Sequence, residues 1–320
     1  MHRSTEALFD LIVIVDWSAA SRPTTGADSI WWSAHDRAAG TTSPPVNPST
    51  RRRVGEQLLE LLDALPDRRV LVGFDFAFGH PRGFAAAADL GVAPSWRAMW
   101  EHLSDRLHDD ADNRNDRFAV ASELNARVSP RVGPFWGTTS ATQVTPHLSR
   151  TKAPGFPHRC AAGPLAEHRL TERYITGVGA RRPASVWQLA GIGSVGSQTL
   201  TGIPVVGALR AHARLAERAL VWPFETGLVA DPTTAHPAAI VFAEVWPSCV
   251  VVDRSRHAVK DAAQVVSLAE HLGKLDAEGG LGPWFAPSLA APDAAAVVDE
   301  EGWILGARPG DAVSSALMPR

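Results

Sequence analysis

Three acidic residues stand at or near the ends of apolar segments that are typical of buried β-strands. Asp16 closes the run LIVIV, Asp75 closes RVLVGF, and Glu244 lies near the end of AAIVFAEVW. In a mostly parallel sheet, the carboxyl ends of the strands border the crevice in which ligands bind. Carboxylates gathered there repel one another unless a cation neutralises them or a proton is shared. Because their oxygens suit a hard divalent ion, the pattern favours a Mg²⁺ or Mn²⁺ site.

Each acid also has a simpler interpretation. An aspartate that follows a strand commonly accepts hydrogen bonds from backbone N–H groups of the turn. A fourth acid, Asp261, falls in the first turn of a predicted helix, where the helix dipole favours a negative charge without any catalytic role. We keep the metal site as the working hypothesis because three acids follow three buried strands.

The segment from Gly191 to Ser197 contains a formal GxGxxG pattern. In a dinucleotide-binding fold the helix begins at the last glycine of that pattern. Here Gly202 and Pro204 are expected to delay the helix to about residue 205, and no second βαβαβ half follows, so a dinucleotide site is disfavoured. A Gly/Ser loop with free N–H groups can instead cradle a phosphate.

Residues 79–183 are rich in arginine, tryptophan and proline, and they lack a strong period. Arginine beside aromatic rings, as at Arg117 and Phe118, suits the recognition of phosphates and bases. The alternative is that these arginines are solvated and the rings form a local core. The residues that we assign to phosphate or substrate contacts are Ser18, Arg159, Arg173, Gly193, Ser194, Gly196, Ser197 and Gln198.

The elements that must position these side chains follow from apolar periodicity. Residues 11–15 and 29–35 predict a hairpin of two strands, 51–65 an amphipathic helix that Pro66 ends, and 69–74 a third strand. Further strands are predicted at 185–190, 220–224, 238–246 and 302–307, with a helix at 259–275. This order predicts an α/β fold with a mixed sheet.

Composition limits the class of protein. The chain has 320 residues, 45% of them hydrophobic, and a formal net charge of -3, so any contact with nucleic acid requires a local basic patch. Two cysteines without a CxxC pair support neither a disulfide framework nor a zinc finger, and they favour a reducing compartment. No apolar segment is long enough for a membrane span, so we expect a cytoplasmic protein without a membrane partner.

Several short motifs resemble a family of uncharacterised proteins that are described as predicted nucleases of the ribonuclease H fold. They are IVDWSAAS at 14–21, GFDFAFG at 73–79, QLAGIGSVGSQTLTG at 188–202, EVWPS at 244–248, KDAAQ at 260–264 and EEGWILG at 300–306. The resemblance implies a ribonuclease H-like mixed central sheet flanked by helices. It divides the chain into a first core part, 1–78, a long insertion after the strand that ends at Asp75, 79–183, and a second core part, 184–320.

The same resemblance implies that Asp16, Asp75, Glu244 and Asp261 are catalytic and hold Mg²⁺ or Mn²⁺. The expected function is then a metal-dependent hydrolase of phosphodiesters, with a nucleic acid or a phosphorylated small molecule as its substrate. Two alternatives stay open: a Mg²⁺-dependent phosphotransferase or other small-molecule enzyme that binds a nucleotide or a cofactor, and a binding module without catalysis. The sequence does not decide the substrate, the oligomeric state or the role of the insertion.

Overall fold

The computed structural model describes residues 7–91, 95–152, 155–175, 183–247 and 250–307. The strands are β1 (Leu11–Asp16), β2 (Trp31–Asp36), β3 (Thr41–Thr42), β4 (Val70–Phe74), β5 (His158–Cys160), β6 (Gly163–Leu165), β7 (Ala219–Val221) and β8 (Ile240–Glu244). The longer helices are α1 (Arg51–Asp63), α3 (Ser95–Arg106), α4 (Arg117–Val128), α6 (Val195–Ala211) and α7 (Lys260–Ala277). The shorter ones are α2 (Phe84–Ala87), η1 (Ala141–Gln143), α5 (Leu170–Ile175), α8 (Gly282–Phe285), α9 (Ala291–Ala296) and η3 (Val297–Glu301).

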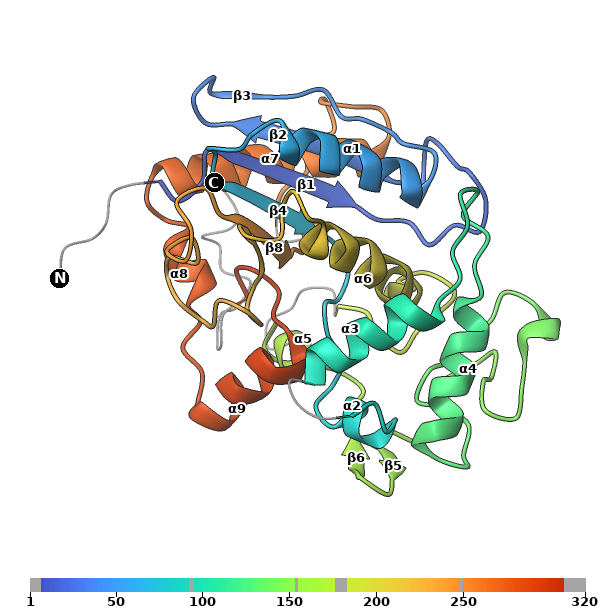
Figure 1. Ribbon diagram of the computed structural model, residues 1–320. Helices are drawn as coiled ribbons and strands as arrows, with labels where there is room; N and C mark the ends of the chain where they lie inside the picture. The colour runs from blue at the N-terminus through green and yellow to red at the C-terminus, as the bar shows by residue number, and fades with distance from the viewer. Residues whose placement is uncertain (1–6, 92–94, 153–154, 176–182, 248–249, 308–320) are drawn as a thin grey trace.

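The centre of the molecule is a mixed sheet with the strand order β3-β2-β1-β4-β8-β7 (Figure 1). Strand β2 pairs antiparallel with β1 and with β3, whereas β1, β4, β8 and β7 run parallel. The predicted hairpin and the predicted α/β class are confirmed. Because β1 and β4 are parallel neighbours in register, with Val15 opposite Phe74, their carboxyl ends lie side by side.

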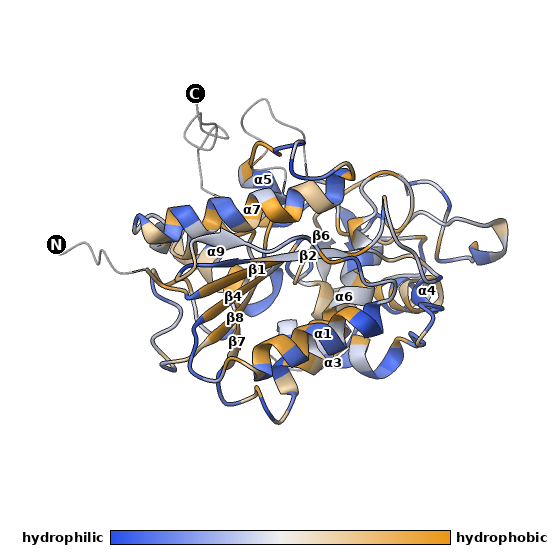
Figure 2. Ribbon diagram, turned by 90° about the horizontal axis from the view of Figure 1, so that it is seen from above, coloured by the Kyte–Doolittle hydropathy of each residue, from blue (hydrophilic) through white to orange (hydrophobic). Residues whose placement is uncertain are grey.

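Helices cover both faces of the sheet, and the apolar strands lie between them (Figure 2). One face packs against α1, α3 and α6 through a hydrophobic cluster that includes Val13, Phe74 and Phe242. The other face packs against α7 and α8 through a second cluster that includes Ile14, Val241 and Ala243. Alternate residues of one strand therefore belong to different layers, as the two-residue period of a strand requires.

The segment 79–183 contributes to the first of these clusters. Phe84, Trp100 and Leu124 are almost fully buried and belong to the same cluster as the inner residues of β1 and β4. Helix α3 lies against α6, and the two-stranded sheet of β5 and β6 stands apart from the central sheet (Figure 1). The insertion thus shares its core with the sheet.

Three predicted elements differ from the structure. The helix expected from about residue 205 already begins at Val195 and runs through Gly202 and Pro204. It does so because α6 is buried on nearly all sides, and packing outweighs the low helix propensity of these residues. Gly202 is required, since a Cβ there would lie 2.3 Å from the Phe76 ring.

The other two differences are strands that the structure reduces to single bridges. In 185–190 only Gln188 forms a bridge, with Trp136, and in 302–307 only Ile304 forms one, with Glu244. Both segments are apolar because tertiary contacts bury them, and a short apolar run does not by itself distinguish a strand from a buried turn. Among the described helices, none has the length and apolar character needed to cross a bilayer. The cytoplasmic location stays a prediction.

Candidate functional site

Asp16 and Asp75 come together at the carboxyl ends of β1 and β4. Asp16 is the last residue of β1, and Asp75 directly follows β4. Their carboxyl groups are within hydrogen-bonding reach of each other, and both side chains are partly buried. The predicted meeting of these two acids is therefore present in the geometry of the described chain.

The turn after β1 fixes the orientation of the Asp75 carboxyl group. The backbone N–H of Trp17 donates to Asp75 Oδ1 at 2.7 Å, and the buried indole of Trp17 donates to Thr201 Oγ1 on α6 at 3.2 Å. Gln198 Nε2 donates to the carbonyl oxygen of Trp17 at 2.6 Å. Helix α6 thereby holds the turn against the sheet and limits the movement of the acid pair.

Asp261 is the third acid of the site and lies in the first turn of α7. Its Oδ2 accepts a hydrogen bond of 2.9 Å from the backbone N–H of Asp28, which has a left-handed backbone with φ 56°. The charge of Asp261 acts on both Asp16 and Asp75. Three of the four predicted acids therefore come together from the end of β1, the end of β4 and helix α7, which packs against β1.

The acid pair is electrostatically strained. Burial raises the pKa of Asp16 well above its usual range, and the nearby charges of Asp75 and Asp261 raise it further, while Lys260 opposes them. Burial raises the pKa of Asp75 to about 7, against the lowering effect of its hydrogen bonds from Trp17 and Asp16. At neutral pH the pair therefore tends to retain a proton, because two adjacent carboxylates without a cation cannot both ionise at low cost.

The structure does not bring Glu244 to the other three acids. Phe74 stands opposite both Val15 and Glu244, so Glu244 shares their face of the sheet, whereas Asp16 and Asp75, one residue further along, point to the opposite face. The expected convergence of four acids is corrected to three. A sequence pattern that places an acid near a strand end does not fix which face the side chain takes.

Glu244 instead belongs to a buried ion-pair network. Arg169, which directly precedes α5, donates to both Glu244 oxygens, at 2.8 and 2.5 Å, and to Glu172 in the first turn of α5. Phe78 N–H completes the set at 3.2 Å. Burial alone would lower the pKa of Arg169, but Glu172 and Glu244 reverse this effect and keep it above its ordinary value. The Glu244 oxygens are thus engaged in a structural network.

The glycine loop lies beside the turn that follows β1, and the N–H groups at its helical end are occupied. Val195 donates to Gly193 O, Gly196 donates to Gln188 O, and both Ser197 and Gln198 donate to Ser194 O. A Cβ at Gly196 would lie 2.3 Å from the carbonyl oxygen of Val186, so this glycine serves close packing. Among the described residues, none accepts a hydrogen bond from the N–H groups of residues 191–194, so the phosphate cradle stays a prediction for that part of the loop.

The structure directs attention to Arg117, which the sequence analysis noted without assigning it to the site. Its side chain is buried and donates to the hydroxyls of Ser197 and Ser21, at 2.8 and 2.9 Å, and to Asn115 Oδ1 at 2.7 Å. No carboxylate among the described residues forms an ion pair with it. Burial and the neighbouring Arg51 lower the pKa of Arg117 to about 10, so it stays charged at neutral pH.

The remaining predicted contact residues are dispersed. Ser18 lies in the turn after β1, where its hydroxyl donates to Asp28 O at 3.0 Å. Arg173 is exposed in the last turn of α5, and Arg159 is exposed on β5, in the small separate sheet. Ser18 therefore borders the acid pair, while no hydrogen bond or ion pair recorded for Arg159 links it to these acids.

The acid pair offers hard oxygen ligands, which suit Mg²⁺ or Mn²⁺. Within the described ranges, however, no three His, Cys, Asp or Glu side chains are already arranged to hold a metal ion. Mg²⁺ is commonly bound by one or two carboxylates together with water and substrate phosphates, and Asp16 with Asp75 fit that kind of site. The residues therefore fit an open metal site, to which the substrate adds ligands, better than they fit a closed cage made of protein ligands alone.

Comparison of the chain with protein-family models, with curated proteins and with solved structures gave no match. The functional argument therefore rests on the residues and their geometry.

Proposed function

We propose that this protein is a divalent-metal-dependent phosphodiester hydrolase on a ribonuclease H-like fold. The observation that carries the proposal is the adjacency of the Asp16 and Asp75 carboxyl groups at the ends of two parallel strands, with Asp261 facing them. The mixed sheet with an antiparallel β1 and β2, flanked by helices, agrees with the fold that the resemblance implies.

In this proposal, Asp16 and Asp75 hold the ion, and Asp261 adds negative charge to the site and positions α7 against the Asp28 turn. A bound Mg²⁺ or Mn²⁺ would supply an activated water and would stabilise the leaving oxygen. Trp17 contributes by donating its backbone N–H to Asp75 Oδ1, which leaves Asp75 Oδ2 as the oxygen for the ion in this proposal. Glu244 has no ligand role in this scheme.

Arg117 is the proposed phosphate contact. A buried guanidinium that is bonded only to neutral groups is costly, and an anionic ligand would offset that cost. Arg117 also contacts Ser21 in the loop that follows Asp16, so the cation and the acid pair border the same loop. A phosphate between them would be oriented by a fork of N–H donors on one side and by the metal on the other.

The test begins with Mn²⁺ titration by calorimetry on the wild type, on Asp16→Asn and on Asp75→Asn. We expect micromolar to millimolar binding that each variant weakens at least tenfold, because each removes one of two charged ligands. The matched control is Asp105→Asn, which changes an exposed acid on α3. If the wild type binds no Mn²⁺, with or without nucleotide present, the hydrolase proposal fails.

Hydrolysis is then measured on a chromogenic phosphodiester, on single-stranded DNA and RNA, and on nucleoside triphosphates. We expect Asp75→Asn to lose a factor of roughly 10² to 10⁴ in rate, the range typical of removing an essential electrostatic group. Arg117→Gln is expected to raise KM more than it lowers kcat, since it is assigned to binding. Turnover of nucleotides alone, with transfer of phosphate to an acceptor other than water, would instead support a phosphotransferase.

A further inference from the structure

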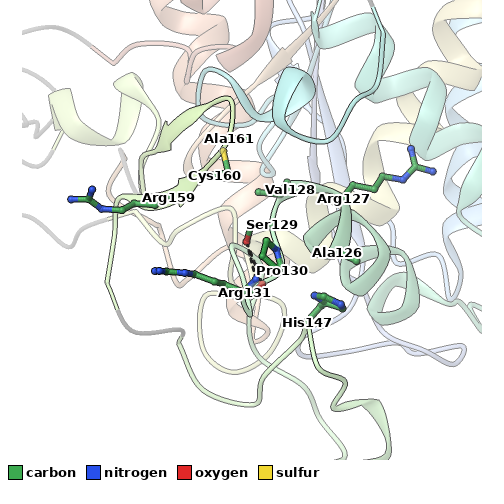
Figure 3. Close-up of a pocket in the computed structure, with 10 residues that line it drawn as sticks. All are labelled: Ala126, Arg127, Val128, Ser129, Pro130, Arg131, His147, Arg159, Cys160 and Ala161. Carbon is green, nitrogen blue, oxygen red and sulfur yellow. Dashed lines mark hydrogen bonds between the residues drawn. The ribbon is translucent and has the colours of Figure 1, made fainter.

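A basic groove of about 700 Å³ lies where the C-terminal end of α4 meets β5 (Figure 3). It is lined by residues 126–131, by His147 and by residues 159–161. Three arginines and one histidine are among these residues, and none of the lining residues is acidic. We name it the arginine groove. In a chain whose net charge is -3, such a local excess of positive charge identifies a surface that attracts anions.

Two of the three arginines have no carboxylate partner. Arg127 forms an ion pair of 3.1 Å with Glu123 on its own helix. Neither Arg131 nor Arg159 forms an ion pair with any acid in the part of the chain that the structure describes. In Figure 3 the Arg131 and Arg159 side chains extend to the same side of the groove, whereas Arg127 points away from them. Arg131 and Arg159 are thus available together.

Buried contacts hold this pair of arginines in place. Ser129 Oγ lies 3.0 Å from His158 Nε2, which connects the segment after α4 to β5, and both residues are buried. Ser129 Oγ also accepts a hydrogen bond of 3.2 Å from the N–H of Arg131. Arg159 directly follows His158 in the chain. Burial and the charge of Arg131 lower the pKa of His158, so the connection between the two arginines stays neutral.

The guanidinium groups of Arg131 and Arg159 decide which ligand the groove suits. Neither has an acidic partner among the described residues, and their planar forks match phosphate oxygens. His147 also lines the groove, but its Nδ1 is itself buried and has no hydrogen bond within the described residues, so a ligand in the groove does not reach that atom. The two arginines therefore favour a phosphate-bearing ligand.

Helix α4 runs from the loop that follows Asp16 to the groove. At its first residue, Arg117 contacts Ser21 in the loop after Asp16, and its last residues line the groove. Twelve residues at a rise of about 1.5 Å correspond to about 17 Å, or roughly five stacked nucleotides at about 3.4 Å each. One phosphate of a mononucleotide cannot occupy both places, whereas a strand can.

We propose that Arg131 and Arg159 bind the phosphodiester backbone of a nucleic acid strand whose reacting phosphate lies at Asp16 and Asp75. This inference rests on the proposed hydrolase function and specifies its substrate as a polymer longer than about five nucleotides. The strand would follow α4 from Arg117 to the groove.

The experiment measures binding of fluorescein-labelled oligothymidylates of 4 and 12 nucleotides by anisotropy, without divalent cations, so that it does not depend on hydrolysis. The double variant Arg131→Gln, Arg159→Gln is compared with the wild type and with Arg214→Gln, which removes an exposed arginine near the C-terminal end of α6. Thermal unfolding verifies that all variants are folded. A 12-mer of uridylate repeats the measurement for RNA.

We expect the wild type to bind the 12-mer at least tenfold more tightly than the 4-mer. The double variant should lose this advantage, and its slope of log K against log salt should fall by about 1.4, the amount for two phosphate contacts on a single strand. Arg214→Gln should bind as the wild type does. Equal binding of both lengths by the wild type would overturn the proposal that a strand binds in the arginine groove. Unchanged binding of the 12-mer by the double variant would overturn it as well.

The two proposals can fail separately. Length-dependent binding that needs Arg131 and Arg159, in a protein that hydrolyses nothing, would keep the groove and remove the hydrolase. Metal-dependent hydrolysis that is indifferent to both arginines and to strand length would keep the hydrolase and remove the groove.

Discussion

Asp75 and Glu244 occupy the ends of neighbouring strands, yet they face opposite sides of the sheet and meet opposite surroundings. Glu244 lies against Arg169, which donates to both of its oxygens. Asp75 lies against another acid, Asp16, and the cation that lowers the pKa of Asp16 is the exposed Lys260. The comparison teaches that burial of a carboxyl group does not indicate its role. A paired acid stabilises the fold, whereas an unpaired one stores unfavourable free energy that a ligand can release.

The largest effect is expected from removing the cation on the Glu244 side. Arg169→Met leaves Glu244 and Glu172 buried beside each other without their shared partner. We expect the free energy of unfolding to fall by about 3 to 5 kcal/mol, the usual cost of breaking a buried ion pair from one side. Urea unfolding at pH 7.5 measures it. The free energy of unfolding of Arg169→Lys should lie between those of the wild type and Arg169→Met. A loss below about 1 kcal/mol for Arg169→Met would contradict the network.

A matched pair of isosteric changes compares the two sides directly. Burial raises the pKa of Glu244 as it does that of Asp75, but Arg169 opposes the rise. At pH 8 without metal, Glu244→Gln should still lower the free energy of unfolding by about 2 kcal/mol, because Arg169 donates to both carboxylate oxygens and the amide NH2 leaves one of these buried donors without an acceptor. Asp75→Asn should raise it, by roughly 1 to 2 kcal/mol, because it removes a charge that is unfavourable in the folded state. The same urea experiment gives both values, and equal signs would refute the contrast.

The gain from Asp75→Asn should depend on pH. Above a pH of about 3.8 the unfolded chain has released the Asp75 proton, while the folded protein retains it up to a pKa of about 7. Because the folded state then binds more protons at Asp75, the contribution of Asp75 to the wild-type free energy of unfolding falls as pH rises from about 4 to about 7, and then levels off. The difference between Asp75→Asn and the wild type should grow over that window. A difference that is constant from pH 4 to pH 8 would exclude the raised pKa.

The smallest effect is expected at Asp261. From α7, its charge acts on Asp16 and Asp75 through space. Its removal in Asp261→Asn lowers the pKa of both Asp16 and Asp75, because its charge raises them. The upper end of the pH-dependent fall should therefore move to lower pH. Asp253→Asn, at an exposed acid before α7, provides the control. An upward shift would show that Asp261 acts mainly through its bond to Asp28.

Much of the sheet could be predicted from the sequence because its strands are continuous apolar runs. The runs that end at Asp16 and Asp75 gave both the strands and the meeting of the two acids. The period of 51–65 gave α1, which ends near the expected Pro66. These features depend on the residues within each short segment, so the sequence alone is enough to predict them.

The rest depends on contacts between distant segments. The face of Glu244 follows from a pairing register one residue out of step with Asp75, and its partner Arg169 is 75 positions away. The uncompensated charge of Arg117 becomes visible only when its neighbours are known to be hydroxyls and an amide. The sequence places the start of α6 about ten residues too far along the chain, because the helix includes Pro204 only through burial that the whole fold provides.

The contact between Gly202 and Phe76 has a consequence for directed evolution of the protein. Phe76 is the next residue but one after Phe74 and directly follows Asp75, so the ring beneath position 202 is attached to the backbone of the acid pair. Any side chain introduced at 202 must displace that ring, and the displacement passes to Asp75 through one peptide unit. A library of variants is therefore best built with glycine kept at position 202, because a change there disturbs Asp75 as well as the packing of α6.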